Sequence, residues 1–245
     1  MRRRKIAVPV VALASLLFWS GPAAAATPRL PDLGMAQLRD FQVDRSTGAR
    51  LLRFSTEIVN VGRGPFEVEG SRPSTAASRM TVDQRLHNDD GTRSTSSTGA
   101  TMVYSGDGHD HWHMEQLEGY TIERVGSRRG LAQGAKIGFC FLDSGAYRTS
   151  LPGAPLSPRY QNCGSQSSTA VTMGLSVGWG DLYPWFLPYQ WIDITGLPGG
   201  EYIVRAKADP RGLFTEASTA NNGTWTRLYI TARDYVVVLE QGPIA

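Results

Sequence analysis

The sequence predicts an all-β fold: an antiparallel β-sandwich with long functional loops and little helix. Several segments alternate apolar and polar residues with a period of two, which is typical of strands with one buried face. No window sustains the 3.6-residue apolar period of an amphipathic helix. The 245 residues include 27 glycines and 14 prolines, which supply turns between the segments. Together these observations favour packed antiparallel sheets in a single domain.

The first 26 residues are predicted to be a secretory signal peptide. Three arginines and a lysine at positions 2–5 precede an apolar run that ends at Trp19, and Ala23–Ala26 offer the small residues at which a signal peptidase cuts. A transmembrane anchor is the alternative, but the apolar run is shorter than the ~20 residues that a membrane span needs. We therefore expect a secreted domain formed by residues 27–245.

The charge balance argues against a nucleic-acid partner. The whole chain has a net charge of +3, but the signal peptide holds four of the positive charges and no negative ones. Its removal leaves 21 basic and 22 acidic residues, a net charge of −1, with no block of lysines or arginines. No second segment has the length and apolarity of a membrane span, so we expect no membrane association after cleavage.

The first clear strand is expected around residues 52–58. Leu52, Phe54 and Ile58 alternate there with charged and polar neighbours. Asn60-Val61-Gly62 then supplies the turn residues that end the strand.

Four more strands are expected towards the C-terminus. Trp191–Thr195 and Glu201–Ala208 are rich in β-branched and aromatic residues. The turn residues of Gly196–Gly200 between them predict that these two strands form a hairpin. The other two strands are predicted at Thr224–Thr231 and Tyr235–Leu239.

Two stretches contain few core residues and are predicted to be long loops. Ser71–Thr101 is rich in Ser, Thr, Arg and Asp, and Ala146–Thr172 is rich in Ser, Pro and Gly. Loops of this length are uncommon unless they carry function or are disordered. The segment between and just after them is therefore where we expect the chemistry.

The two cysteines, Cys140 and Cys163, are expected to form a disulfide, because an even pair in a secreted chain meets an oxidising compartment. A thiolate metal site or a nucleophilic cysteine is the alternative, but the sequence has no CxxC spacing to support it.

Three of the four histidines stand at alternating positions: His109, His111 and His113. On an extended strand, residues i, i+2 and i+4 share one face, so three imidazoles could surround one metal ion. Neutral imidazoles suit copper or zinc better than calcium or magnesium. The alternative is a polar strand face without a metal. The fourth histidine, His87, is expected in a solvated loop.

These histidines, followed by Glu115 and Tyr120, resemble the copper-binding segment of the lysyl oxidase family. Further segments are similar to that family in the same order over about 200 residues. They are Leu30–Leu33, Leu51–Phe54, Val59–Gly62, Ser71–Pro73, Gly134–Cys140, Gly174–Ser176, Asp181–Tyr183, Gln190–Thr195 and Gly200–Ile203.

The resemblance implies that copper is held by His109, His111 and His113, and that Lys136 and Tyr183 are crosslinked into a lysine tyrosylquinone (LTQ). The residue types suit this chemistry, because a tyrosine ring can be hydroxylated and a neutral lysine amine is a nucleophile. Without the resemblance, Lys136 would be an ordinary surface lysine and Tyr183 one of nine tyrosines.

The resemblance also implies a calcium site, made only of oxygen ligands. Its predicted ligands are Asp32, the carbonyl of Leu33, Glu216, Asn221 and Asn222. Ser218 stands where the animal enzymes carry an acidic ligand, which removes one carboxylate from the set.

The implied function is that of a secreted, copper-dependent amine oxidase, similar to protein-lysine 6-oxidase. It would convert primary amines to aldehydes and release hydrogen peroxide and ammonia. Its partners would be dioxygen and either small amines or exposed lysines of extracellular proteins. The triple-arginine signal and the Arg-rich composition suggest a bacterial source. Asp143 and Asp181 are candidates for the catalytic base.

Two alternatives stay open at this stage. The first is a secreted copper- or zinc-binding β-sandwich module without turnover. The second is a zinc hydrolase that uses the same histidines and a bound water molecule.

Overall fold

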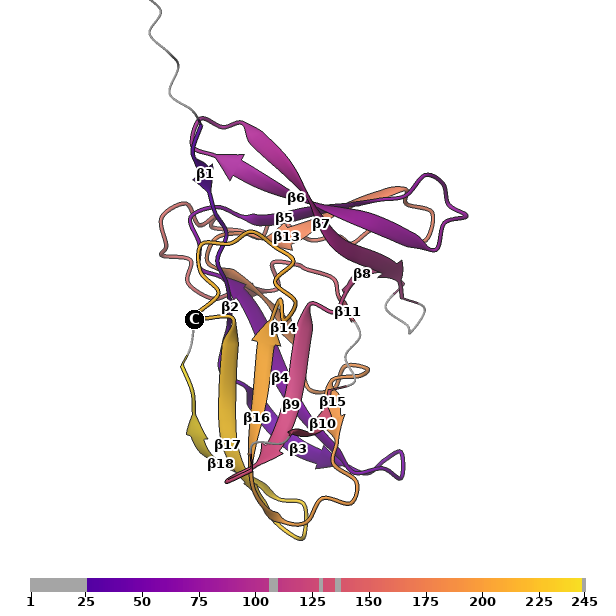
Figure 1. Cartoon of the computed structure of the whole chain (residues 1–245), viewed down its shortest axis with the longest axis vertical. Helices are drawn as coiled ribbons and strands as arrows, with labels where there is room; N and C mark the ends of the chain where they lie inside the picture. The colour runs from indigo at the N-terminus through magenta and orange to yellow at the C-terminus, as the bar shows by residue number, and fades with distance from the viewer. Residues whose placement is uncertain (1–25, 106–109, 128–129, 135–137, 244–245) are drawn as a thin grey trace, which may run out of the picture.

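The computed structural model describes residues 26–105, 110–127, 130–134 and 138–243 (Figure 1). Within these ranges every regular element is a β-strand and the paired strands run antiparallel, which confirms the predicted all-β fold. None of the described residues forms a helix long and apolar enough to cross a membrane. The predicted signal peptide lies outside the described residues except for Ala26.

The first sheet has the strand order β11-β8-β7-β6-β5-β13, and β1 pairs with β6. Its strands are β1 (Pro28–Arg29), β5 (Phe66–Ser71), β6 (Arg79–Asn88), β7 (Arg93–Tyr104), β8 (Trp112–Glu115), β11 (Gly138–Phe139) and β13 (Ala170–Leu175).

The second sheet has the order β10-β9-β16-β17-β18. Its strands are β9 (Glu118–Arg124), β10 (Gly130–Gln133), β16 (Gly200–Ala208), β17 (Gly223–Ile230) and β18 (Val236–Gln241). The third sheet has the order β12-β14-β4-β15, and β2 and β3 also pair with β4. Its strands are β2 (Leu33–Met35), β3 (Arg39–Asp44), β4 (Leu51–Asn60), β12 (Gly145–Ala146), β14 (Trp179–Tyr183) and β15 (Trp191–Asp193).

The second and third sheets pack face to face in the lower part of Figure 1, and the first sheet crosses above them. Large buried side chains join the two facing layers: the rings of Phe54 on β4 and Tyr120 on β9 meet edge to face, with centroids 5.2 Å apart. Phe66 on β5 joins the first sheet to the same core through Phe141 and Phe214, each with its ring centroid 5.1 Å from that of Phe66. One continuous apolar core therefore holds all three sheets.

Strand β4 is buried on both faces, although its sequence alternates in polarity. Leu52, Phe54 and Ile58 enter the core as predicted. Polar side chains on the other face are covered as well, and they find partners there: Ser55 donates a hydrogen bond to Asp40 at 2.7 Å. The polarity alternation correctly predicts a strand, but it predicts one buried face where both faces are buried. The segments that cover the second face are distant in the sequence, so the local pattern does not reveal them.

The prediction that Ser71–Thr101 is a loop is wrong. This stretch contains β6 and most of β7, which form a long antiparallel hairpin. Most of β7 has an exposed face, so serine and threonine suffice there and the strand carries little apolar signal. By contrast, residues 147–169 lack regular secondary structure, which confirms most of the second predicted loop.

The predicted hairpin between Trp191–Thr195 and Glu201–Ala208 is also wrong. β15 pairs with β4 in the third sheet, whereas β16 pairs with β9 and β17 in the second. The Pro/Gly turn is present, but it carries the chain from one sheet to the other, because β15 is hydrogen-bonded to the edge of β4 and β16 to β9 and β17. The two last predicted strands are confirmed as β17 and β18, which pair with each other.

Strand β18 forms one edge of the second sheet. Val237, Val238 and Leu239 on it are 48%, 45% and 46% exposed, and Tyr235 just before it is 70% exposed. This edge is the most apolar part of the exposed strand surface among the described residues.

We expect Phe54→Ala to lower the free energy of unfolding by about 3–5 kcal/mol, because it would leave a cavity where the facing sheets meet. Urea denaturation followed by tryptophan fluorescence would measure the loss. Phe186 is 63% exposed, so Phe186→Ala is the control and should change stability by less than about 0.5 kcal/mol. Equal effects of the two substitutions would contradict the assigned core.

Candidate functional site

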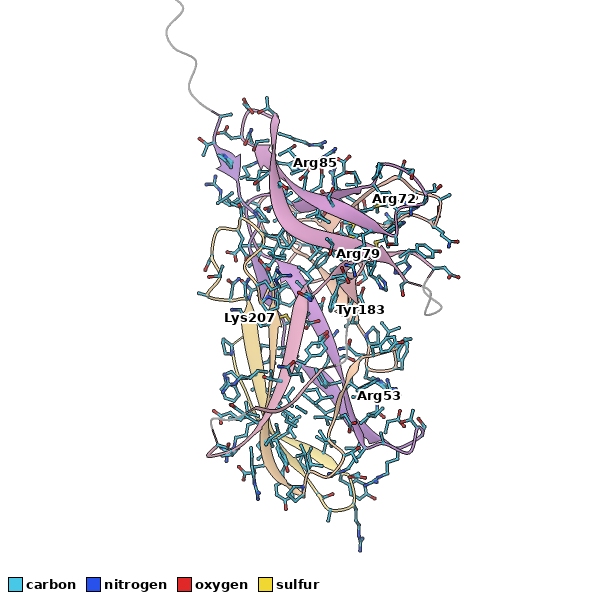
Figure 2. All side chains as sticks on the ribbon, turned by 45° about the vertical axis from the view of Figure 1, so that its right-hand side comes forward. Arg53, Arg72, Arg79, Arg85, Tyr183 and Lys207 are labelled. Atoms are coloured by element: carbon cyan, nitrogen blue, oxygen red, sulfur yellow. A yellow bond between two sulfur atoms is a disulfide. The ribbon has the colours of Figure 1, made fainter. Side chains whose placement is uncertain are left out.

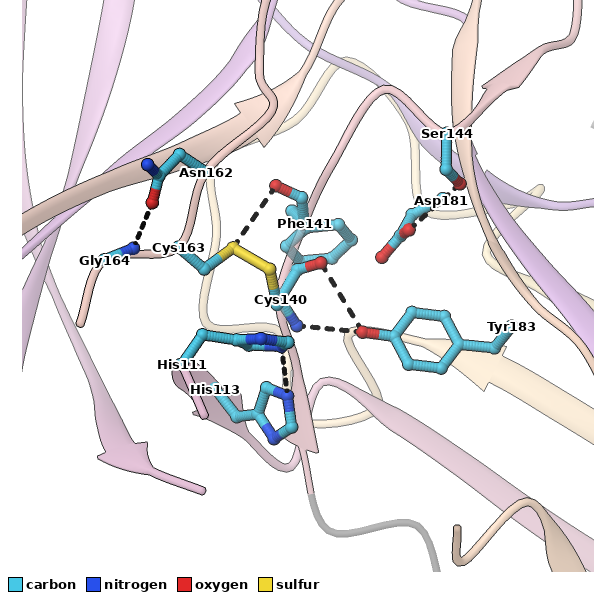
Figure 3. Close-up of a disulfide and its surroundings, with 10 residues drawn as sticks. All are labelled: His111, His113, Cys140, Phe141, Ser144, Asn162, Cys163, Gly164, Asp181 and Tyr183. Carbon is cyan, nitrogen blue, oxygen red and sulfur yellow. Dashed lines mark hydrogen bonds between the residues drawn. A yellow bond between two sulfur atoms is a disulfide. The ribbon is translucent and has the colours of Figure 1, made fainter. Parts of the chain in front are cut away.

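Two of the three histidines predicted to bind metal are described, and their imidazoles meet (Figure 3). His113 lies on β8 and is buried, and the half-buried His111 directly precedes that strand. Their Nε2 atoms are 2.8 Å apart. Two nitrogens bound at right angles to one metal ion, each about 2.0 Å from it, would be about 2.8 Å apart. The pair therefore fits two adjacent positions around a single ion.

The third predicted ligand, His109, lies outside the described residues. The predicted extended strand is confirmed from Trp112 onwards but is wrong at Asp110, where φ is 50°. This left-handed conformation is one that aspartate tolerates better than most residues, and it turns the backbone just before His111. Trp112 points away from the histidines, is fully buried and donates its Nε1–H to the carbonyl of Ser165 at 2.8 Å.

Tyr183 lies at the end of β14, in the interior of the molecule (Figures 2 and 3). Its hydroxyl accepts a hydrogen bond from the backbone N–H of Cys140 at 3.0 Å and lies 3.4 Å from the carbonyl oxygen of the same residue. Its ring lies against Phe139, with centroids 4.4 Å apart. The tyrosine predicted to form the quinone is thus held by the backbone of the segment that follows Lys136.

Residues 138–140 lie between Tyr183 and the histidine pair. Strand β11 pairs with β8, which carries His113. A Cβ atom added at Gly138 would lie 2.9 Å from the Cβ of His113 and 2.8 Å from the carbonyl oxygen of Met114. Glycine is therefore required for this close approach. The same short segment contacts His113 on one side and Tyr183 on the other, which brings the two into one site.

Lys136 lies outside the described residues. The described residues that flank it are held by hydrogen bonds and by a sheet. Gly134 donates its N–H to the carbonyl of Tyr120 at 3.0 Å, and Gly138 belongs to β11. A Cβ atom at Gly134 would meet the ring of Tyr120 at 2.3 Å, so this second glycine also permits a close contact.

Cys140 and Cys163 form the expected disulfide, with Cα atoms 5.8 Å apart (Figure 3). This pairing rules out the alternative of a thiolate metal site or a nucleophilic cysteine. The carbonyl of Cys163 accepts the backbone N–H of Trp112 at 3.0 Å. The disulfide therefore ties the segment that holds Tyr183 to the start of the histidine strand.

The two aspartates considered as bases differ in their surroundings. Asp181 lies two residues before Tyr183 on β14, so the two side chains leave the same face of the strand. Asp181 is buried, and its Oδ1 accepts the hydroxyl of Ser144 at 3.2 Å. Asp143 accepts three backbone N–H groups and the hydroxyl of Ser176, which marks it as a structural anchor for the nearby loops.

A buried polar network near the site was not predicted from the sequence. The Tyr120 hydroxyl donates to Glu118 Oε2 at 2.5 Å, and Gln190 Nε2 donates to the Tyr120 oxygen at 3.1 Å and to Thr56 Oγ1 at 3.2 Å. Burial, together with the negative charge of Glu118, raises the pKa of Tyr120 well above its ordinary value, so this phenol stays protonated. Tyr120 and Gln190 belong to family-like segments, but nothing local indicates that they meet.

The predicted calcium ligands come together. Glu216 accepts the N–H of Leu33 at 2.9 Å and the amide of Asn222 at 2.7 Å, and Asp32 accepts the amide of Asn221 at 2.9 Å. The amide oxygens of both asparagines are buried without a hydrogen-bond partner. Burial raises the pKa of both carboxyl groups. Two half-buried carboxylates and two orphaned amide oxygens fit a hard cation such as calcium.

Among the residues that the structure describes, no three His, Cys, Asp or Glu side chains are grouped as metal ligands. The described part of the predicted copper set contains two histidines, and the predicted calcium set combines two carboxylates with amide and carbonyl oxygens.

A family model described as lysyl oxidase matches residues 80–240. The chain is 34% identical to protein-lysine 6-oxidase of Gallus gallus over 119 residues, which are 46% of this chain and 24% of that protein. It is 29% identical to human lysyl oxidase homolog 1 over 126 residues, 51% of this chain and 20% of that protein. Human lysyl oxidase homolog 3 is 28% identical over 176 residues, 71% of this chain and 18% of that protein. The matched regions thus span about a quarter or less of these relatives.

Replacing both cysteines, as Cys140→Ser with Cys163→Ser, should lower the free energy of unfolding by about 3 kcal/mol, because the bridge restricts the unfolded chain. Thermal unfolding of the variant and of the wild type, each with and without reductant, would measure this. Reductant should lower the melting temperature of the wild type and leave that of the variant unchanged. If full reduction of the disulfide left the wild-type melting temperature unchanged, the bridge would not be stabilising.

Proposed function

Because this chain belongs to the lysyl oxidase family, we propose that it is a secreted, copper-dependent amine oxidase of the protein-lysine 6-oxidase type. It converts primary amines to aldehydes, consumes dioxygen and releases hydrogen peroxide and ammonia. The relatives named protein-lysine 6-oxidase support peptidyl lysine as a substrate, beside small primary amines. Secretion is supported by the predicted signal peptide and by the disulfide.

One observation carries the proposal: residues 138–140 contact His113 on one side and the Tyr183 hydroxyl on the other. A metal held by His113 and a tyrosine to be oxidised must lie close together, and this arrangement supports that. In the proposal, His109, His111 and His113 hold the copper ion.

The proposed organic cofactor is LTQ, made from Lys136 and Tyr183. Copper and dioxygen supply the oxidising equivalents for its formation, and the finished quinone supplies an electrophilic carbonyl for the amine. The protein itself positions the ring of Tyr183 and shields it from solvent. The Cys140 backbone fixes the Tyr183 hydroxyl, and Phe139 covers the ring, which keeps water and competing nucleophiles away.

Asp181 is the better candidate for the group that accepts a proton from the substrate carbon. It is buried and shares a strand face with Tyr183, whereas Asp143 is occupied by four hydrogen bonds. A buried carboxylate on the same strand face as the reacting ring is the kind of group that can serve as a general base.

We also propose that Asp32, the carbonyl of Leu33, Glu216, Asn221 and Asn222 hold calcium. The orphaned amide oxygens of the two asparagines support this assignment. The ion would fasten β2 to the loop that precedes β17, far from the chemistry, so its role is structural.

Replacing any one of His109, His111 or His113 with alanine should abolish both copper retention and amine oxidation, because two imidazoles leave a site from which buffer removes the ion. Metal analysis after dialysis would measure the retained copper. His87→Ala is the matched control, since His87 hydrogen-bonds to Glu67 and should leave copper retention unchanged. Full copper occupancy in all three alanine variants would refute the ligand assignment.

Copper-loaded, aerobic protein should yield one branched peptide that joins the segments of Lys136 and Tyr183 after proteolysis. In the quinone form its mass equals the sum of the two peptides plus one oxygen and minus four hydrogens, because the ring gains an oxygen and a nitrogen substituent and is oxidised. The protein should also be coloured and react with phenylhydrazine. Tyr183→Phe should remove the colour and the branched peptide.

If proteolysis of copper-loaded, aerobic protein gave only separate Lys136 and Tyr183 peptides, the oxidase proposal would be refuted. A metal-binding module without turnover would then be the better account. If zinc in place of copper supported hydrolysis without oxygen consumption, the hydrolase alternative would replace both.

Calcium should stabilise the protein at about pH 7.5, by about 2.7 kcal/mol when free calcium is 100 times its dissociation constant. The benefit should shrink as the pH falls, because protons compete for Asp32 and Glu216, whose pKa values are raised in the folded chain. Without a divalent cation the sign reverses: the folded state binds these protons more tightly than the unfolded state, so acidification from neutral pH favours folding at this site. Melting temperatures with and without calcium, for the wild type and Glu216→Gln, would measure both effects. An equal calcium shift in Glu216→Gln would contradict the site.

A further inference from the structure

A cavity of about 450 Å³ lies at the end of the β6–β7 hairpin that is remote from the histidine pair. Four arginines from four separate segments line it: Arg29, Arg63, Arg93 and Arg159. We call this cavity the arginine pocket. Arg93 and Tyr104 are the two ends of the 12-residue strand β7, which at about 3.3 Å per residue separates them by about 35 Å. Figure 2 shows Arg85, on the adjacent strand β6, near the upper end of the molecule and Tyr183 well below it.

The four arginines of the pocket differ from most others in the chain. In the described structure, none of the four has a carboxylate within ion-pair distance, and all four are exposed. Elsewhere, arginines are paired: Arg45 and Arg50 with Asp234, Arg53 with Asp44, Arg205 with Glu123, and Arg227 with Glu201. Four like charges gathered around one cavity repel each other unless an anion joins them.

One carboxylate, that of Glu67, also lines the pocket, but both of its oxygen atoms already interact with neighbouring side chains. Its Oε2 accepts the Tyr160 hydroxyl at 2.6 Å and lies 3.1 Å from His87 Nε2. Its Oε1 lies 3.8 Å from Arg85. Burial, with Glu67 as the next cause, raises the pKa of Tyr160, so the phenol remains a donor to Glu67. The floor of the pocket is thus a closed network, and the arginine charges above it stay available.

The backbone positions of the arginines are fixed. Arg29 pairs with His87 across β1 and β6, and the N–H of Arg63 donates to the carbonyl of Leu30 at 2.9 Å. The buried Asp143 accepts the N–H of Arg159 at 2.7 Å. Because the backbone of these arginines is fixed, only their side chains need to be ordered when a ligand binds, which lowers the entropy cost of binding.

We propose that the arginine pocket binds a small molecule that carries phosphate or sulfate groups with at least two negative charges. Guanidinium groups are planar and donate paired hydrogen bonds that match the geometry of such oxyanions. The cavity volume falls in the range of ligand sites, about 300–1,000 Å³, so it admits an organic phosphate as well as an inorganic ion. The site is separate from the proposed amine oxidase chemistry and does not depend on it.

Inorganic pyrophosphate is the probe for this proposal, and isothermal titration calorimetry on the purified wild-type protein would measure its binding. We expect saturable binding of one pyrophosphate per chain. The double variant Arg93→Gln with Arg159→Gln should bind at least about tenfold more weakly, because half of the guanidinium groups are gone. The matched control is Arg124→Gln with Arg233→Gln, two exposed arginines outside the pocket whose removal changes the net charge equally. The control should bind as the wild type does.

Absence of saturable pyrophosphate binding would overturn the proposal. So would an equal loss of affinity in the pocket and control variants, which would show that net charge alone attracts the anion. Acetate, with one charge, should bind at least about tenfold more weakly than pyrophosphate. Equal affinities would overturn the requirement for two charges. If only a sulfated polymer bound, the site would be a surface for polyanions and the small-ligand proposal would fail. Copper content and amine oxidation should be the same in all variants, which separates this test from that of the proposed function.

Discussion

The pairing of β4 with strands on both of its edges is the constraint on which the rest of the molecule depends. Ten residues of one strand align β14, β15, β2 and β3. Asn60 at its end accepts the N–H of Asp32 and donates to the carbonyls of Gly64 and Leu175, so it fixes the loops that follow. Because β4 is paired along both edges, a shift of its register by one residue would change every residue pair along both edges. It would also move each side chain of β4 to the opposite face of the sheet.

The functional elements inherit their positions from this strand. Tyr183 stands opposite Thr56 in the β14–β4 pairing, and Thr56 also contacts the Tyr120 network. Leu33, one of the predicted calcium ligands, stands opposite Asn60 in the β2–β4 pairing. The predicted quinone tyrosine therefore pairs with the middle of β4, and the predicted calcium ligand Leu33 pairs with its C-terminal end. The disulfide then attaches the histidine strand, which belongs to a different sheet, to this frame.

The sequence predicts local features such as strands, turns and the disulfide well, but it predicts poorly which strands pair with each other. The alternation around Phe54, the turn after Asn60 and the paired cysteines all correspond to structure, because each depends on neighbouring residues or on a pair without competitors. The hairpin expected beside Gly196–Gly200 does not exist, because β15 pairs with the distant strand β4, a choice that the local turn residues do not determine. β7 was missed because its exposed face needs no apolar residues. The site could be predicted by resemblance, whereas the meeting of Tyr120, Gln190 and Thr56 could not, since those positions are joined by the fold alone.

The exposed edge at β18 has a consequence for how the protein behaves in concentrated solution. A free edge with consecutive valines and a leucine offers backbone donors and acceptors together with an apolar surface, which is the combination that allows strand-by-strand self-association. Charged side chains counter this at one end, where Arg227 lies between Glu201 and Glu240. At the opposite end, just before Tyr235, Asp234 pairs with Arg45 and Arg50, so the apolar residues in the middle of β18 are the unprotected part of this edge in the described residues. Solubility, and not resistance to unfolding, should therefore be the property most sensitive to changes at this edge, and a charged residue in place of Val238 is the simplest way to increase it.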